Sequence, residues 1–136
     1  MGWGYLGDRH GYKGVFILSS VCSLAGTLAL LIVPGLWVSY VTYALIGAGL
    51  GGFMIAGSNL VLEFGSERER AMRIATHNSA TELVGMVAFL GAGALADLVS
   101  VELAFLASIA LHGLSILGVL RMREPRRRGL PAQGIE

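Results

Sequence analysis

Residues 14–33 read GVFILSSVCSLAGTLALLIV, twenty consecutive positions without a charged side chain. An α-helix rises 1.5 Å per residue, so twenty residues extend about 30 Å, which matches the hydrocarbon core of a bilayer. The run is continuously apolar and does not alternate, unlike the strands of a membrane β-barrel. It therefore predicts a transmembrane helix, which we expect to end in a tight turn at Pro34 and Gly35.

Three further stretches have the same character, over residues 36–62, 73–97 and 101–120. The whole chain of 136 residues is 54% apolar and 14% charged, with a mean hydropathy of +0.69. Soluble domains carry about a quarter charged residues. The fold class that this predicts is an all-α membrane protein with four transmembrane helices.

The basic residues divide the connections into two kinds. All ten lie before the first span, between the second and third, or after the fourth, at Arg9, Lys13, Arg68, Arg70, Arg73, Arg121, Arg123, Arg126, Arg127 and Arg128. Loops rich in Lys and Arg stay on the cytoplasmic side. We therefore expect a multi-pass protein of the cell membrane with both termini in the cytoplasm, residues 1–13 forming a cytoplasmic loop and residues 121–136 a cytoplasmic basic tail.

Several other classes of function are disfavoured by the composition. The net charge is +1, and the basic residues form no stripe interleaved with aromatics, so no nucleic-acid partner is expected. Cys22 has no second thiol with which to bind a metal. The glycine-rich residues 47–52 fall inside a predicted transmembrane span, whereas a dinucleotide site needs its glycines in the turn between a strand and a helix. We expect no enzyme activity, no metal and no cofactor.

Residues 4–13 read GYLGDRHGYK. This stretch resembles the cytoplasmic signature of the major facilitator superfamily, G-x-x-x-D-[RK]-x-G-x-[RK], and matches it at Gly4, Asp8, Arg9, Gly11 and Lys13. Glycines let helix ends approach closely, and an Asp accepts hydrogen bonds from a helix N-terminus. The resemblance implies a gating motif that latches two helices in one conformational state.

The resemblance also implies a position within such a carrier. Residues 59–64, 67–71 and 76–78 look like the junction of helices ten and eleven, and the Arg-rich tail is similar to the segment after helix twelve. The third span lacks the glycine-proline signature that many antiporters of the family carry in helix five. The chain is thus identified with helices nine to twelve, the alternative being helices three to six, and its implied partners are the missing N-terminal helices and the lipid bilayer.

One face of the third span carries the candidate transport residues, which are His77, Asn78, Thr81 and Glu82, followed by Gly85. An ionisable group at the bilayer centre costs about 3 kcal/mol or more, so Glu82 is a candidate functional residue. The resemblance implies that the second and third spans line a central cavity, to which Tyr43 is a further candidate contributor. The expected ligands are a small-molecule solute and a coupling proton or cation.

Each of these residues also has a structural interpretation. Glu82 alternatively pairs with a cation near Arg70 and Arg73, and Tyr43 alternatively belongs to an aromatic belt at the interface. His112 is a lone imidazole midway along the fourth span, where it can hydrogen-bond a neighbouring helix.

Glycines provide the candidate contacts between helices. Gly47 and Gly51 have the small-x-x-x-small spacing that lets membrane helices approach closely, and we assign Gly85 the same role in helix packing.

Two other functions stay open. The chain is alternatively a self-contained four-helix protein that dimerises into a small exporter, although the carboxylate expected in the first span of such proteins is missing. The second alternative is a membrane scaffold without transport activity, which packs with another chain through its glycine-rich faces.

Overall fold

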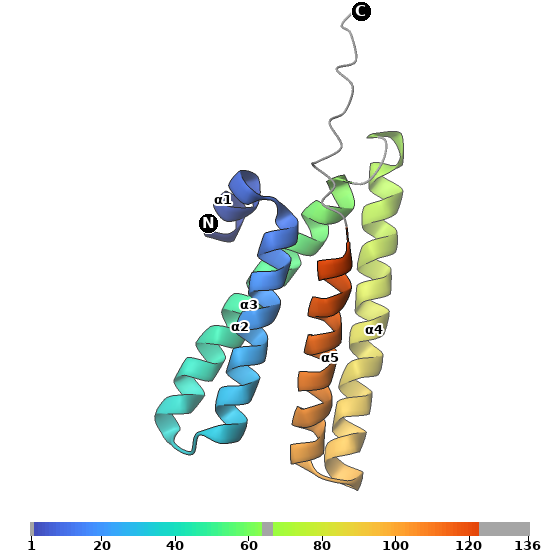
Figure 1. The fold of residues 1–136 in the computed structure, drawn as a ribbon. Helices are drawn as coiled ribbons and strands as arrows, with labels where there is room; N and C mark the ends of the chain where they lie inside the picture. The colour runs from blue at the N-terminus through green and yellow to red at the C-terminus, as the bar shows by residue number, and fades with distance from the viewer. Residues whose placement is uncertain (1, 64–66, 123–136) are drawn as a thin grey trace, which may run out of the picture.

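The computed structural model describes residues 2–63 and 67–122, and all regular structure within them is helical (Figure 1). Four helices are long and apolar enough to cross a membrane, namely α2 (Tyr12–Ile32), α3 (Leu36–Glu63), α4 (Arg70–Leu98) and α5 (Val101–Arg121). Two shorter ones are α1 (Gly2–His10) and the 3-10 turn η1 (Glu67–Glu69). The predicted fold class is confirmed, and the start of each long helix lies within three residues of the expected position.

Helix α1 is the main departure from the predicted elements, because residues 1–13 were expected to form a loop. The helix ends at Gly11, whose φ of 92° lies in the left-handed region that favours glycine. The Gly11 N–H still donates to the carbonyl oxygen of Gly7 at 2.8 Å. The signature motif therefore forms a short helix followed by a sharp turn into α2.

The two short connections between spans are tight turns, one built on a glycine and the other on a serine that caps the next helix. Gly35, with φ 134°, permits the reversal between α2 and α3, as the Pro-Gly pair predicts. Before α5, the side chain of Ser100 accepts a hydrogen bond from the backbone N–H of Leu103 at 3.1 Å, which is an N-cap.

Helices α2 and α3 form the most closely packed pair. Val15 and Ser19 of α2 and Ala56 of α3 are fully buried. The ring centroids of Phe16 and Phe53 lie 5.1 Å apart, and the Thr42 hydroxyl on α3 donates to a backbone carbonyl oxygen of α2. Small side chains at this interface allow the backbones to approach closely, as is typical of membrane helices.

The four long helices are arranged as two hairpins, α2–α3 and α4–α5, with α5 lying between α2 and α4 (Figure 1). The hairpins are close together at the end that carries both termini of the described chain and diverge toward the other end (Figure 1). Helix α4 contacts two of the long helices, α5 and α3.

No residue of α4 is buried within the described chain. Its large apolar side chains are largely exposed, with exposed fractions of 84% for Phe89 and 68% for Leu90. In a bilayer, such surface is covered by lipid or by other helices. Most of the circumference of α4 is thus available to partners outside the two hairpins.

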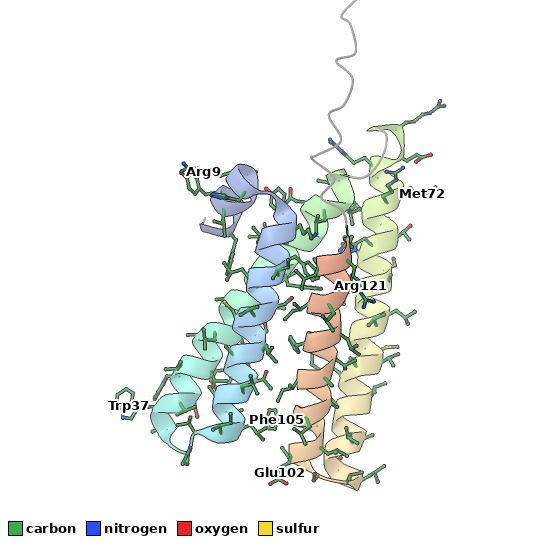
Figure 2. All side chains as sticks on the ribbon, in the orientation of Figure 1. Arg9, Trp37, Met72, Glu102, Phe105 and Arg121 are labelled. Atoms are coloured by element: carbon green, nitrogen blue, oxygen red, sulfur yellow. The ribbon has the colours of Figure 1, made fainter. Side chains whose placement is uncertain are left out.

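The charges divide between the two ends of the bundle. Arg9 and Arg121 lie at the end where α1 is found, whereas Trp37 and Glu102 lie at the opposite end (Figure 2). Lys13 is in the first turn of α2, Arg68 is in η1, and Arg70 and Arg73 are in the first turn of α4, at the end of the bundle that carries Arg9. The predicted basic tail, residues 123–136, lies outside the described residues.

Candidate functional site

The signature motif forms a small structure of its own around Tyr12. The Tyr12 hydroxyl donates to the Asp8 carboxylate at 2.7 Å, and the Tyr12 side chain is 7% exposed. A Cβ added at Gly7 would approach the Tyr12 Cζ to 2.8 Å, closer than real contacts allow. Gly7 therefore makes room for the ring that holds the motif Asp at the beginning of α2.

Lys13, the last residue of the motif, connects the start of α2 to the end of α5. Its Nζ donates to the backbone carbonyl oxygen of Leu120 at 3.2 Å and to that of Met122 at 2.5 Å. The last carbonyls of a helix have no partner within the helix and carry partial negative charge, which a cation stabilises. The motif thus fixes two helices at the same end of the bundle.

The other two motif residues have local surroundings. The Arg9 guanidinium donates to the Tyr5 hydroxyl at 3.1 Å, one turn earlier on α1. A Cβ added at Gly4 would meet no atom within 4 Å, so the described chain contains no contact that needs a glycine there. The gating role of the five motif residues stays a prediction.

The candidate transport residues of α4 point in more than one direction. Asn78, Thr81 and Glu82 are exposed, while His77 is half-buried against α3. A Cβ added at Gly57 would lie 3.2 Å from the His77 Nε2, so this glycine provides the space for the imidazole. His77 belongs to the α3–α4 contact, and the other three are exposed within the described chain.

Glu82 lies deep in α4. It follows Arg70, the first residue of the helix, by twelve positions, which is about 18 Å along the axis. Arg73 lies nine residues before Glu82, two and a half turns away and on the opposite face, and its guanidinium bonds to Glu69. An ion pair between Glu82 and Arg73 does not form in this arrangement.

Tyr43 is 77% exposed and lies in the first third of α3, toward the end of the bundle that carries Trp37. It is seven residues from the start of α3 at Leu36, about 10 Å, whereas Glu82 is sixteen residues from the end of α4 at Leu98, about 24 Å. Measured along its own helix, Tyr43 lies nearer the end of its span than Glu82 does. Trp37 and Tyr40, whose ring centroids are 5.8 Å apart, are exposed at the same end, as an aromatic belt requires.

The close contact between α2 and α3 uses other glycines than those singled out from the spacing. A Cβ added at Gly47, Gly51 or Gly85 would meet no atom within 4 Å. At Gly49 the added atom would lie 2.7 Å from the carbonyl oxygen of Ser19, and at Gly52 it would lie 2.7 Å from the Ser19 Cβ. Gly47, Gly51 and Gly85 are available for packing against helices outside this chain, and that role stays a prediction.

Sequence reasoning missed three features of this region. Tyr12 occupies a variable position of the motif, and only its spacing of four residues after Asp8 could have indicated the hydrogen bond. A Cβ at Gly52 would lie 3.1 Å from the Trp3 ring, which shows that α1 is held against α3. The serines of α2, at Ser19, Ser20 and Ser23, line one space between the two hairpins, and Ser19 and Ser23 also pack against Gly49 of α3.

Within residues 2–63 and 67–122, no group of three or more His, Cys, Asp or Glu side chains is placed to hold a metal ion.

A family model described as Major Facilitator Superfamily matches the chain over residues 1–136. No curated protein and no solved structure matches it significantly.

Proposed function

The chain belongs to the major facilitator superfamily, a family of transporters, and from this we propose that it supplies helices nine to twelve of a carrier that moves a small solute by alternating access. The chain is a multi-pass membrane protein with four helices long and apolar enough to span a bilayer. The carrier would lie in the cell membrane with the α1 end of the bundle in the cytoplasm.

The observation that carries the proposal is the match of the family model along all 136 residues. The exposure of α4 supports it, because a carrier of two six-helix halves would cover this helix with helices that the chain does not contain. The position of the described basic residues at one end supports the orientation.

We assign the coupling role to Glu82. Glu82 lies about 18 Å into α4 and is exposed, and no cation within the described residues lies near it along the helix. A carboxylate at such depth binds a proton or a cationic group when it faces protein or water. Asn78 and Thr81, on the same exposed side, would contribute hydrogen bonds to the solute, and Tyr43 would contact it nearer the outer end.

The transport proposal is tested in inverted vesicles that contain the full-length carrier, energised so that their lumen is acidic and reported by a pH-sensitive dye. Solutes from a panel of sugars, amino acids, organic acids and amines are added one at a time. At least one solute should change the pH gradient in these vesicles and leave vesicles without the carrier unchanged. A carrier that is inserted and folded but moves no member of the panel, by this dye or by direct uptake, would count against the proposal.

The gene itself provides a second test of the position within the carrier. A continuous reading frame upstream of Met1 with eight further apolar spans is expected. A stop codon directly upstream would contradict helices nine to twelve and would favour a self-contained four-helix protein.

A further inference from the structure

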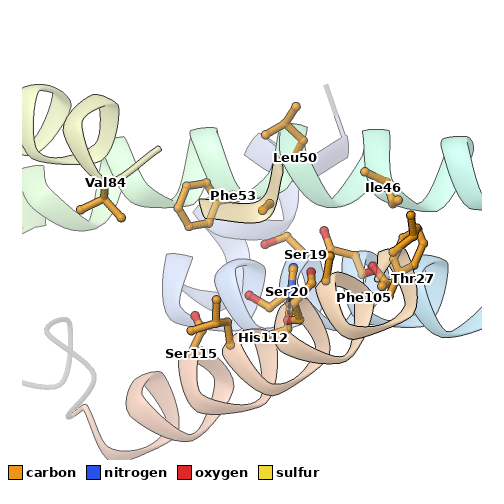
Figure 3. Close-up of a pocket in the computed structure, with 16 residues that line it drawn as sticks. Ser19, Ser20, Thr27, Ile46, Leu50, Phe53, Val84, Phe105, His112 and Ser115 are labelled. Carbon is orange, nitrogen blue, oxygen red and sulfur yellow. Dashed lines mark hydrogen bonds between the residues drawn. The ribbon is translucent and has the colours of Figure 1, made fainter. Parts of the chain in front are cut away.

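A cavity of about 760 Å³ lies between the two hairpins and is lined by all four long helices (Figure 3). Helix α3 contributes apolar side chains, Ile46, Leu50 and Phe53, and α2 and α5 contribute most of the polar ones (Figure 3). Glu82 does not line it. The cavity is therefore separate from the exposed residues of α4 to which we assign coupling.

Three hydroxyl groups of α2 that line this cavity bond back to carbonyl oxygens of their own helix. The Oγ atoms of Ser19 and Ser20 both donate to the carbonyl oxygen of Phe16 at 2.9 Å. Thr27 donates in the same way to the carbonyl oxygen of Ser23 at 3.0 Å. A hydroxyl has one proton, so each of these groups has used its donor within α2, and with exposed fractions of 0%, 7% and 6% Ser19, Ser20 and Thr27 offer a ligand little polar surface.

His112 of α5 presents a hydrogen-bond acceptor to the cavity. Its Nδ1 lies 2.8 Å from the carbonyl oxygen of Ser108, and because a carbonyl only accepts, Nδ1 holds the proton. In the neutral ring the proton is then absent from Nε2, which becomes an acceptor. His112 is eleven residues from the start of α5 at Val101, about 16 Å, which places it near the middle of this 21-residue helix.

The remaining lining indicates the charge of a ligand. His112 is the one ionisable side chain among the described residues that line the cavity. A charged molecule at this depth would have no counter-ion there, and an unpaired buried charge is costly. A neutral molecule with a hydrogen-bond donor and an apolar body fits both walls, and the volume is typical of sites for small molecules.

We propose that this cavity binds a neutral lipophilic alcohol whose hydroxyl donates to Nε2 of His112 and whose hydrocarbon part packs on Phe53, Ile46 and Leu50. The site is distinct from the proposed solute pathway and does not depend on the transport function. The alcohol reaches it from the bilayer, in which such molecules concentrate.

The probe for this site is 3-azioctanol, an eight-carbon alcohol that forms a covalent bond to nearby side chains on illumination. The 136-residue chain is labelled in detergent and the adducts are mapped by mass spectrometry. Adducts should lie on the cavity faces of α2, α3 and α5, and excess 1-octanol should suppress them whereas octane should not. His112→Leu should weaken the apparent affinity between about two- and tenfold, the effect of one hydrogen bond, and His77→Leu should leave it unchanged.

Equal suppression by octane and 1-octanol would overturn the proposal, because the hydroxyl would then contribute nothing. Adducts confined to the exposed face of α4 would overturn it as well. The comparison of the two competitors uses the unsubstituted chain, so it decides the question even where His112→Leu fails to fold. Labelling of the full-length carrier shows whether its other helices leave the cavity open, and loss of the adducts there would refute the site.

Discussion

The Nζ of Lys13 lies 3.2 Å from the backbone carbonyl oxygen of Leu120, although the two residues are 107 positions apart in the chain. Lys13 is in the first turn of the first long helix, and Leu120 is in the last turn of the fourth. The contact joins the two hairpins at the end where the signature motif is found. Any movement that separates α2 from α5 at this end has to break it.

Replacing Lys13 with Met should loosen the end of α5. The variant keeps the length of the side chain but removes the donor to the last carbonyl groups, so hydrogen exchange of the amides at the end of α5 should accelerate about two- to tenfold. Arg9→Met is the matched control, because Arg9 bonds to Tyr5 within α1. Equal acceleration of exchange in both variants would show that Lys13 does not specifically cap the end of α5.

Gly49→Ala should destabilise the α2–α3 hairpin by about 1–3 kcal/mol, because the new methyl group would meet the backbone of Ser19 at 2.7 Å and the Ser23 hydroxyl. Gly47→Ala on the same helix should change the stability of this chain by less than about 0.5 kcal/mol, since it faces open space. Thermal unfolding in detergent, followed by circular dichroism, measures both. The reverse order of stabilities would show that α3 presents a different face to α2.

Gly7→Ala should displace the Tyr12 ring and break its hydrogen bond to Asp8, since the ring occupies the space of the added methyl group. Gly4→Ala is the control, because nothing lies within 4 Å of its added Cβ. Tyrosine fluorescence is masked by the two tryptophans, so Tyr12 is best followed by its NMR side-chain resonances. Unchanged Tyr12 resonances in Gly7→Ala would argue against the described packing of α1.

Glu82→Gln in the full-length carrier should abolish the pH change that accompanies solute movement while the protein level stays constant, because the amide cannot exchange a proton. Glu102→Gln removes a carboxylate in the first turn of α5 and should leave the coupling intact. Proton-coupled movement that survives Glu82→Gln would exclude this residue as the coupling site.

The four long helices follow from the sequence because a bilayer imposes one requirement, an apolar run of sufficient length, that can be counted directly. The α1 helix was not predicted, since Gly2, Gly4 and Gly7 are typical of a loop and the docking of Trp3 on Gly52 is visible only in three dimensions. The packing partners of Gly47 and Gly51 could not be predicted from the sequence either. Glycine spacing identifies a helix face without indicating which neighbour it meets.

The candidate site was predictable in part. The depth of Glu82 follows from its place in an apolar run. Arg73 could be excluded as its partner only once the structure showed that both residues lie on one helix, on opposite faces, and that Arg73 pairs with Glu69. The cavity between the hairpins was not predicted, because the serines of α2 and His112 of α5 are far apart in the sequence and only the packing of the two hairpins brings them to one space.

The arrangement of four spans with both ends on the cytoplasmic side is tested most directly by labelling of single cysteines in intact cells. With Cys22 replaced by Ala, a membrane-impermeant maleimide should label Val33→Cys and Val99→Cys, which lie in the two short connections, and should label Gly2→Cys only after permeabilisation. Labelling of Gly2→Cys in intact cells, or of only one of the two connections from outside, would contradict the account.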